Sequence, residues 1–357
     1  MKEKTIIING QFAARRMTGQ ERFAYELMLA LDKIVGEDCN IRLVVPTNAF
    51  NVPILKNIKV VRFGKAKGSA WEQIFLALYS LLHRGTTVNL CTCMPLLKPG
   101  IICIHDLCSK EKPEYYNTLY SKVSRIWHLL IFRWAWWFSP IILTVSEYSK
   151  KRIIDIYQIN PNRIKVISNG WEHFIKIKEN DKIKYNNINY FSKPYFFALG
   201  SHDPRKNIEW IINVARNHPQ YNFLIAGNID LKVYNKDYRD YELPNLFFLG
   251  YVSDGEVKYL MKHCRAFLFP SFFEGFGIPP LEALSLGTKI VVSNATCLPE
   301  IFGDAAYFIN PLNSNVDLDE ILSKKIGKPD NVLQKYTYKH SAELLVDIFK
   351  EIRNNDC

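Results

Sequence analysis

The fold is decided by the stretch Pro270–Ala283, which reads PSFFEGFGIPPLEA. It follows a short apolar run, and its glycines and prolines prevent a continuous helix, which predicts a strand end, a loop and then a helix. Such a loop exposes backbone N–H groups to a ligand. Of its two carboxylates, Glu274 can accept hydrogen bonds from sugar hydroxyls, and Glu282, on the following helix, from a ribose. A surface turn with incidental glutamates is the alternative, which the crowding of both acids, two glycines and Phe276 disfavours.

Outward from this loop, short β-branched runs alternate with longer segments of helical period. The strands predicted in the second half are Tyr195–Leu199, Asn222–Ala226, Leu246–Leu249, Ala266–Phe269, Lys289–Ser293 and Ala306–Ile309. Those predicted in the first half are Thr5–Asn9, Ile41–Pro46, Val60–Phe63, Thr87–Leu90, Gly100–His105, Ile141–Val145 and Lys165–Ile167. The main helical patterns of the first half are Gln20–Ile34, Trp71–His83 and Glu147–Tyr157. This alternation predicts an α/β fold of two doubly wound, Rossmann-like domains that face each other across a cleft, with ligands beyond the carboxyl ends of parallel strands.

The length of 357 residues suits two domains of roughly 150 to 180 residues each. We place an N-terminal domain at residues 1–175 and a C-terminal domain at residues 195–335. Residues 176–194 between them are rich in Lys, Asn and Ile and end in proline, which indicates a linker. A composition that is 48% hydrophobic and 23% charged excludes a largely disordered chain.

The charge is distributed unequally along the chain. Residues 1–180 hold 26 Lys and Arg against 14 Asp and Glu, a net charge of +12, whereas residues 181–357 hold 20 against 21, a net charge of −1. A basic half indicates an anionic partner, such as a phosphorylated substrate, nucleic acid or an acidic membrane surface, and solubility charge is the alternative. The aromatic and basic residues form no RNA- or DNA-binding motif, so we expect no nucleic-acid partner.

The eight cysteines indicate a reducing compartment. Their spacing is irregular and several stand in apolar runs, as expected for buried thiols in a cytoplasmic protein. No CxxC pair is present, so we expect no zinc site. The N-terminus lacks a signal-peptide core, and no window of eighteen uncharged apolar residues occurs, so we expect no membrane span.

Two candidate residues stand at strand ends in the first half. Gly19 lies at a strand-to-helix turn, where a phosphate can approach the backbone at the positive end of a helix, although most such glycines only make turns. There is no GxGxxG pattern, which disfavours an ordinary dinucleotide site. His105 stands at the carboxyl end of the predicted strand Gly100–His105 and can orient or deprotonate a hydroxyl. A structural histidine bonded to backbone is the equal alternative.

A third candidate is the segment Gly200–Asn207, GSHDPRKN, directly after a strand. Arg205 and Lys206 form a predicted diphosphate clamp, because Arg can fork onto two oxygens while Lys supplies a mobile charge. The alternative is a basic helix N-terminus, which is electrostatically unfavourable because cations belong at the other end of a helix. That cost favours a bound anion.

These motifs together resemble the retaining family-4 glycosyltransferases of the GT-B fold, whose Glu-x7-Glu motif is matched by Glu274 and Glu282. The resemblance extends over nearly the whole chain. Within the family, the chain is most similar to the group that contains mannosyltransferases of bacterial O-antigen synthesis. The segments that carry it, besides GSHDPRKN, are MTGQERFAYEL at 17–27, IHDL at 104–107, TVSEYSK at 144–150 and VISNG at 166–170. The segment Tyr336–Glu343 resembles the one that leads into the family's final helix. The resemblance implies that this C-terminal helix, at about 336–353, packs back on the first domain.

The resemblance implies a role for each candidate residue. Arg205 and Lys206 would hold the donor diphosphate, and Glu282 would bind the ribose. Glu274, with the loop of Gly275, Phe276, Gly277 and Ile278, would hold the transferred sugar. Gly19 would approach the donor phosphates or the acceptor, and His105 would contact the sugar near the reacting carbon. Ser201 departs from the family pattern, because many members carry Arg there.

The resemblance also implies the chemistry. In the family no metal or other cofactor is needed. Positive side chains and helix ends would stabilise the departing charge. We expect front-side departure and attack with retention of configuration, in which the diphosphate helps to deprotonate the acceptor and Glu274 is not a covalent nucleophile.

The functional hypothesis is a hexosyltransferase of bacterial cell-surface polysaccharide synthesis, such as O-antigen or capsule, with a GDP-mannose donor and a glycan or lipid-linked acceptor. A GT-B epimerase or phosphorylase is one alternative, and a non-catalytic nucleotide-sugar binding protein is another. Residues 119–140 combine three basic residues with four tryptophans. This composition predicts a helix that makes peripheral contact with the inner face of an anionic membrane. The alternative is an aromatic helix packed on the sheet.

Overall fold

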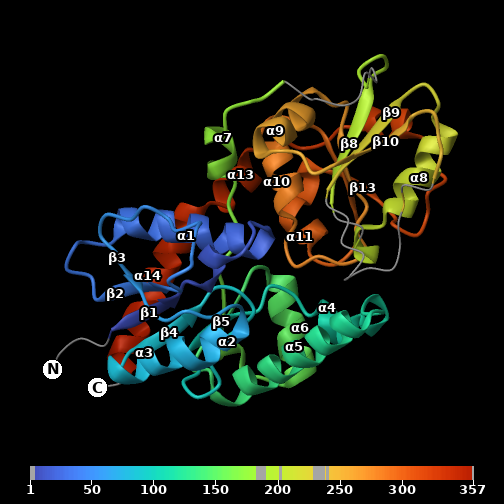
Figure 1. The fold of residues 1–357 in the computed structure, drawn as a ribbon. Coiled ribbons are helices and arrows are strands. Elements are labelled where there is room, and N and C mark those ends of the chain that lie inside the picture. The colour runs from blue at the N-terminus through green and yellow to red at the C-terminus, as the bar shows by residue number, and fades with distance from the viewer. Residues whose placement is uncertain (1–4, 182–189, 201–202, 228–237, 239–240, 356–357) are drawn as a thin grey trace. The chain divides into compact units, whose positions relative to one another are not determined.

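The computed structural model describes residues 5–181, 190–200, 203–227, 238 and 241–355. The chain divides into two compact units (Figure 1). The first unit comprises Met1–Leu107, Ile126–Gly170 and Tyr336–Cys357, and the second comprises Cys108–Arg125 and Trp171–Lys335. Each unit has its own fully parallel sheet, which confirms the predicted α/β class with two doubly wound, Rossmann-like domains.

The first unit is built on a seven-stranded sheet in the order β3-β2-β1-β4-β5-β6-β7. Its strands are β1 (Ile6–Asn9), β2 (Ile41–Val45), β3 (Lys59–Arg62), β4 (Thr86–Asn89), β5 (Ile101–Cys103), β6 (Ile142–Thr144) and β7 (Ile164–Val166). The central strand β1 is buried at every residue and pairs in parallel with both neighbours, Ile6 lying opposite Ile41 and Thr86. The seven strands predicted for this half are confirmed. The buried ones, such as β1, leave a clear signal because strands covered on both faces are runs of β-branched residues.

Helices cover both faces of this sheet. On one face α1 (Gly19–Ile34) packs against α14 (Tyr338–Asn355), whose ends differ by two residues from the predicted 336–353. The right-handed crossovers that lead from β3 to β7 put their helices on the opposite face. These are α2 (Ser69–Trp71), a π-helical turn (Glu72–Leu76), α3 (Ala77–Leu82), α6 (Glu147–Tyr157) and the part of α5 (Leu119–Phe138) from Ile126 onward (Figure 1). No helix within the described ranges is both long enough and apolar enough to cross a bilayer.

The second unit is built on a six-stranded sheet in the order β10-β9-β8-β11-β12-β13. Its strands are β8 (Tyr195–Leu199), β9 (Asn222–Ala226), β10 (Leu246–Gly250), β11 (Phe267–Phe269), β12 (Ile290–Ser293) and β13 (Tyr307–Ile309), all predicted from the sequence. Its helices are α4 (Cys108–Glu111), α7 (Glu172–Lys176), α8 (Ile208–Asn217), α9 (Asp254–His263), α10 (Ile278–Ser285), α11 (Leu298–Phe302), α12 (Leu318–Ser323) and α13 (Asp330–Lys335). The order reverses between β8 and β11, and at such a switch point the loops beyond the strand ends diverge and leave room for a ligand.

Short 3₁₀ turns connect the main elements, at Gln11–Ala14, Pro113–Tyr115, Pro161–Arg163, Pro204–Lys206 and Gly303–Ala305. Of the linker predicted at 176–194, residues 182–189 lie outside the described residues. The ordered elements on either side are α7, which ends at Lys176, and β8, which begins at Tyr195.

Candidate functional site

The loop that follows β11 is held in one conformation by hydrogen bonds to nearby side chains and by a glycine turn. Ser293 Oγ donates to the carbonyl of Ser271 at 2.6 Å, and the amide of Glu274 donates to Thr296 Oγ1 at 3.2 Å. Gly277 caps α10 at a φ of +100°, and a Cβ added there would lie 2.9 Å from Leu298 Cδ2. Only glycine adopts this conformation at low cost, so the sequence itself fixes the turn that leads into α10.

The loop after β8 is joined to the loop after β11. Asn207 adopts the left-handed conformation, with a φ of 55°, and its Nδ2 donates to the carbonyls of Pro270 at 3.1 Å and Pro311 at 2.8 Å. The amide of Phe272 donates to the carbonyl of Arg205 at 2.7 Å. These bonds set the predicted clamp residues beside the Glu274 loop. Ser201 and His202 of the same segment lie outside the described residues.

Lys206 and Glu274 form a nearly buried ion pair. Lys206 Nζ donates to Glu274 Oε1 at 2.7 Å, and the two side chains are 17% and 9% exposed. The ammonium also lies over the ring of Phe269, 4.9 Å from its centroid, which is cation–π distance. An ammonium has three N–H donors. Lys206 can therefore hold Glu274 in place and still donate to a phosphate oxygen.

Arg205 is oriented differently from its neighbour. Its Nε donates to Asp203 Oδ2 at 2.5 Å, and Asp203 also accepts from the Arg205 amide at 3.0 Å. Asp203 is buried and precedes the Pro204–Lys206 turn. The sequence treats Arg205 and Lys206 as one clamp, but the structure gives each cation its own carboxylate partner.

The second glutamate of the motif lies on α10 and contacts a histidine from α7. His173 Nε2 and Glu282 Oε1 are 2.8 Å apart, and both side chains are buried. Sequence reasoning missed His173, because 109 positions separate the two residues and no local pattern marks this histidine. Within the loop between the glutamates, Gly275 and Phe276 are buried and Ile278 is half-buried. Phe276 therefore belongs to the core, and its backbone is the part suited to a ligand.

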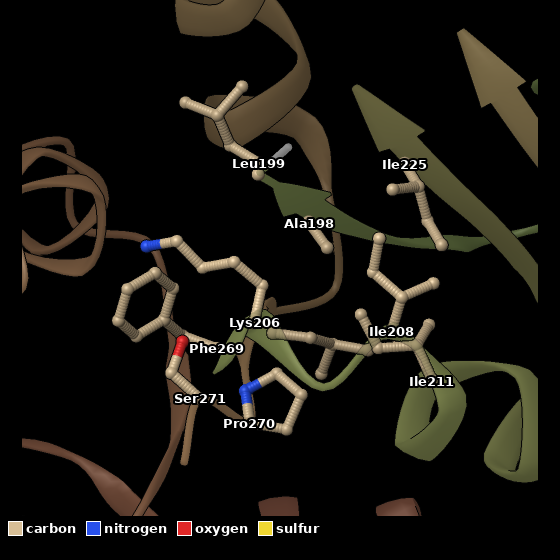
Figure 2. Close-up of a pocket in the computed structure, with 11 residues that line it drawn as sticks. Ala198, Leu199, Lys206, Ile208, Ile211, Ile225, Phe269, Pro270 and Ser271 are labelled. Atoms are coloured by element: carbon tan, nitrogen blue, oxygen red, sulfur yellow. The ribbon is translucent and has the colours of Figure 1, made fainter. Parts of the chain in front are cut away.

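A pocket lies beside the Lys206 side chain, at the carboxyl ends of β8 and β11 (Figure 2). Gly200, Phe269 and Ser271 contribute to its lining, and its free volume of about 10 Å³ has room for about one water-sized group. Ser271 is 1% exposed, and its Oγ has no hydrogen-bond partner among the described residues. Sequence reasoning missed this hydroxyl, which becomes a candidate ligand contact because buried polar atoms are rarely left unpaired. This volume is far below the ~300 Å³ at the low end of ligand pockets, so the pocket holds at most one small group of a ligand.

The first unit brings two other predicted residues close together. Gly19 opens α1, and one turn later the ring of Phe23 meets His105 edge-on, with 5.0 Å between centroids. The start of α1 is tied to the loop after β4, because the amide of Thr92 donates to Gln20 Oε1 at 3.2 Å. Gly19 and His105 therefore belong to one local structure at the carboxyl ends of the strands.

His105 is a buried, neutral histidine. Its Nε2 donates to the carbonyl of Leu90 at 2.8 Å, which leaves Nδ1 as the acceptor of the neutral ring. Burial lowers the pKa of His105, and the Leu90 carbonyl, Asp106 and Glu21 oppose that shift without cancelling it. The backbone bond expected of a structural histidine is present, and the remaining acceptor suits a substrate hydroxyl.

A buried polar cluster near the same strand ends was not predicted. Asn9 Nδ2 donates to Glu72 Oε1 at 3.1 Å and to Asn89 Oδ1 at 3.0 Å. Arg15 lies 3.8 Å from both Glu21 and Glu72. Glu21, in the first turn of α1, is also hydrogen-bonded to Thr18. The cluster fixes the turn that contains Gly19, and it unites residues that are up to 80 positions apart in the chain.

The chain is similar to known proteins in both sequence and structure. Residues 179–340 match the family described as glycosyl transferases group 1. The O-antigen chain mannosyltransferase RfbU of Salmonella typhimurium is 27% identical over 95% of this chain and 98% of its own length.

Among solved structures, sucrose-phosphate synthase of Thermosynechococcus elongatus gives a TM-score of 0.70 at 13% identity, over 98% of this chain and 99% of its own. HepE of Anabaena, solved in complex with UDP and glucose, gives 0.67 at 14% identity, over 98% of this chain and 100% of its own. At such low identities the two structures establish the fold alone, and that fold is GT-B, as the resemblance implied.

Proposed function

We propose that the chain transfers a hexose with retention of configuration. The premise is that residues 179–340 form a glycosyl transferases group 1 domain and that the chain is a glycosyltransferase. The donor in this proposal is a nucleotide-diphosphate sugar, with GDP-mannose favoured. The acceptor is a glycan or a lipid-linked oligosaccharide of a bacterial surface polysaccharide. The observation that carries the proposal is the Lys206–Glu274 pair, which puts a cation and a carboxylate together at the ends of β8 and β11.

The donor site in this proposal divides into a phosphate part and a sugar part. Lys206 and Arg205 would bind the diphosphate, and Ser271 would donate from the pocket beside them. Glu274 would accept hydrogen bonds from hydroxyls of the transferred sugar, with the backbone N–H groups of Gly275, Phe276, Gly277 and Ile278 nearby. Prolines at 279 and 280 lack N–H groups, so the donors at this end of α10 come from the residues before them.

Glu282 would accept hydrogen bonds from the ribose. Its contact with His173 holds one carboxylate oxygen and leaves the other to a ligand. The orientation of Glu282 would then be fixed before the donor binds, which lowers the entropy cost of binding.

The reaction would proceed without a metal or other cofactor. Charge develops on the diphosphate as the bond from its oxygen to the sugar carbon breaks, and the nearby ammonium and guanidinium groups would stabilise that charge. The acceptor oxygen would attack from the same face while its proton passes to the departing diphosphate. Glu274, held by Lys206, would position the sugar without forming a covalent bond to it.

The first unit would supply the acceptor side of the reaction. His105 Nδ1 would accept a hydrogen bond from the sugar near the reacting carbon, and Gly19 would let a phosphate or the acceptor approach the start of α1. Similarity to RfbU supports mannose as the sugar and polysaccharide synthesis as the setting. The seven described cysteines form no disulfide, which supports a cytoplasmic location.

The test is a panel of nucleotide sugars scored by thermal shift and by analysis of the products. A ligand at 100 times its dissociation constant stabilises the folded state by about 2.7 kcal/mol, so the true donor should raise the melting temperature clearly. GDP-mannose should do so in the wild type and much less in Lys206→Met. A protein stabilised by none of the donors would contradict the proposal. Interconversion of the nucleotide sugar without transfer would instead identify an epimerase.

A further inference from the structure

The first sheet has a switch point of its own, and a buried polar cluster lies at its strand ends. The strand order reverses between β1 and β4, so the loops that follow these two strands diverge (Figure 1). Asn9, the last residue of β1, donates through Nδ2 to Oδ1 of Asn89, the last residue of β4, at 3.0 Å. The same Nδ2 donates to Glu72 Oε1 at 3.1 Å. The cluster therefore occupies the position at which open parallel sheets bind ligands.

Two acceptor atoms of this cluster lack donors. Glu72 is 1% exposed, and its Oε2 has no hydrogen-bond partner among the described residues. Gln11 is 3% exposed, its amide donates to Asn9 Oδ1 at 3.1 Å, and its Oε1 is likewise without a described partner. Buried polar atoms are rarely left unpaired. Two such atoms in residues that both bond to Asn9 indicate that a group from outside the chain supplies the donors.

The backbone holds Glu72 in an unusual local structure. Glu72 opens the π-helical turn Glu72–Leu76, and single π turns inside α-helices occur frequently at functional sites. The next residue, Gln73, donates to the carbonyl of Met94 at 2.8 Å and accepts from the amide of Leu96 at 2.9 Å. These bonds tie the turn to the loop after β4. The Glu72 carboxylate is therefore in place before any ligand binds.

Arg15 is the member of the cluster that a ligand can reach. Its side chain is 33% exposed, and its guanidinium lies 3.8 Å from a carboxylate oxygen of Glu21 and from one of Glu72. That distance allows charge attraction but is too long for a hydrogen bond. The guanidinium has no shorter polar contact within the part of the chain that the structure describes. Since a guanidinium has five N–H donors, Arg15 has donors to offer to a ligand.

The local charge selects the class of ligand. Two carboxylates already compensate the one guanidinium, so a bound anion would meet repulsion from Glu21 and Glu72. A hydroxyl group suits this arrangement better, because it accepts from a guanidinium and donates to a carboxylate. A sugar ring presents several hydroxyls on neighbouring carbons. The cluster therefore fits an uncharged sugar better than a phosphate.

We propose that this cluster binds an uncharged terminal sugar of the acceptor and that Arg15 selects that sugar. Arg15 donates to ring hydroxyls, and a hydroxyl, directly or through a water, supplies the donor that Glu72 Oε2 lacks. Glu72 is a positioning residue, because it holds the guanidinium and compensates its charge. The adjoining turn at Gly19 then serves the acceptor and not a phosphate. This inference rests on the proposed function, because it assigns the acceptor side of the same transfer.

The experiment is saturation-transfer NMR on the full chain in the presence of GDP, which occupies the donor site. The probes are the methyl glycosides of mannose, galactose, glucose and rhamnose, and at least one of them should bind to the wild type. Arg15→Met should weaken that binding about tenfold, the loss expected for hydrogen bonds to a charged group. Inorganic pyrophosphate, followed by phosphorus NMR, is the anionic probe and should bind to Arg15→Met no more weakly than to the wild type.

Glu72→Gln separates recognition from a merely structural role. The variant keeps the shape of the side chain and an oxygen for Asn9, but it leaves Arg15 with one carboxylate fewer. Binding of the glycoside should weaken, whereas pyrophosphate should bind more tightly than it does to the wild type. A general loss of packing would weaken the binding of both probes. Arg15→Lys, which keeps the charge without the fork of N–H donors, provides a second variant if Arg15→Met does not fold.

The matched control is Arg16→Met. Arg16 is the next residue along the chain, and its side chain is exposed. Arg16→Met removes the same charge from the same loop, and it should bind the glycoside as the wild type does. The thermal shift induced by GDP should be the same in all variants, because no altered residue belongs to the proposed donor site of the second unit.

Three results would overturn the proposal. They are the absence of binding by every glycoside, undiminished binding by Arg15→Met, and an equal loss in Arg16→Met. Pyrophosphate that binds to the wild type and not to Arg15→Met would assign the cluster to an anion instead. A normal GDP-induced shift alongside any of these results would leave the transferase proposal intact.

Discussion

The Lys206–Glu274 pair offers the sharpest test of the donor site. Lys206→Met keeps the apolar stem that lines the pocket and removes the charge, and Glu274→Gln keeps the shape of the side chain. At 2.7 Å and an effective dielectric constant of about 20, the attraction between the two charges is about 6 kcal/mol. Desolvation of two side chains that are 17% and 9% exposed offsets much of it. We therefore expect each single variant to lose about 2 to 3 kcal/mol of unfolding free energy.

A double-mutant cycle measures the interaction itself. Lys206→Met combined with Glu274→Gln leaves no unpaired charge, so its loss should be close to that of one single variant, with a coupling energy of about 2 kcal/mol. The assay is unfolding in urea of the four proteins. Binding of the nucleoside diphosphate to Lys206→Met should fall about 30-fold to 100-fold, the loss expected for a hydrogen bond to a charged group.

The chain provides a matched control on its surface. Lys262 and Glu179 have a nitrogen-to-oxygen distance of 2.8 Å, but their side chains are 49% and 29% exposed. Exposed pairs contribute little to stability because water screens their attraction, so the cycle of Lys262→Met and Glu179→Gln should give a small coupling energy and unchanged donor binding. A coupling energy at Lys206–Glu274 no larger than this control would refute the energetic argument. Undiminished donor binding by Lys206→Met would refute its assignment to the diphosphate.

Two further predictions concern the loop after β11 and the histidine of the first unit. Gly277→Ala should lose about 2 kcal/mol of unfolding free energy and weaken donor binding, because a φ of +100° strains any residue with a Cβ. Gly36→Ala, where an added Cβ meets nothing within 4 Å, is the control in urea unfolding, and equal losses would contradict the argument. Burial lowers the pKa of His105 in the folded state. As the pH falls below about 6.5, His105 is therefore protonated in the unfolded chain before it is protonated in the folded chain. The stability contributed by neutral His105 is therefore present above that pH and lost below it. His105→Asn should flatten the pH dependence of unfolding free energy between pH 7 and 5, and an unchanged slope would refute this.

The sequence by itself determined the architecture and the positions of the loops that carry the candidate site. Strands buried on both faces, such as β1 and β8, need runs of apolar residues, and the turn at Gly277 needs glycine. Both requirements are local, so they can be read from neighbouring residues. The same holds for the position of Arg205 and Lys206 directly after a strand, because the carboxyl ends of parallel strands collect at one edge of a sheet.

Only the tertiary structure decided which of these groups meet. Lys206 reaches Glu274 across 68 positions and His173 reaches Glu282 across 109, while Arg205 turns to Asp203. Contacts between distant residues depend on how strands and helices pack, and no short pattern encodes them. For the same reason the sequence did not decide whether α5 is a core helix or an exposed one. The two sides of one helix can differ in burial, and only packing against the sheet decides which side faces outward.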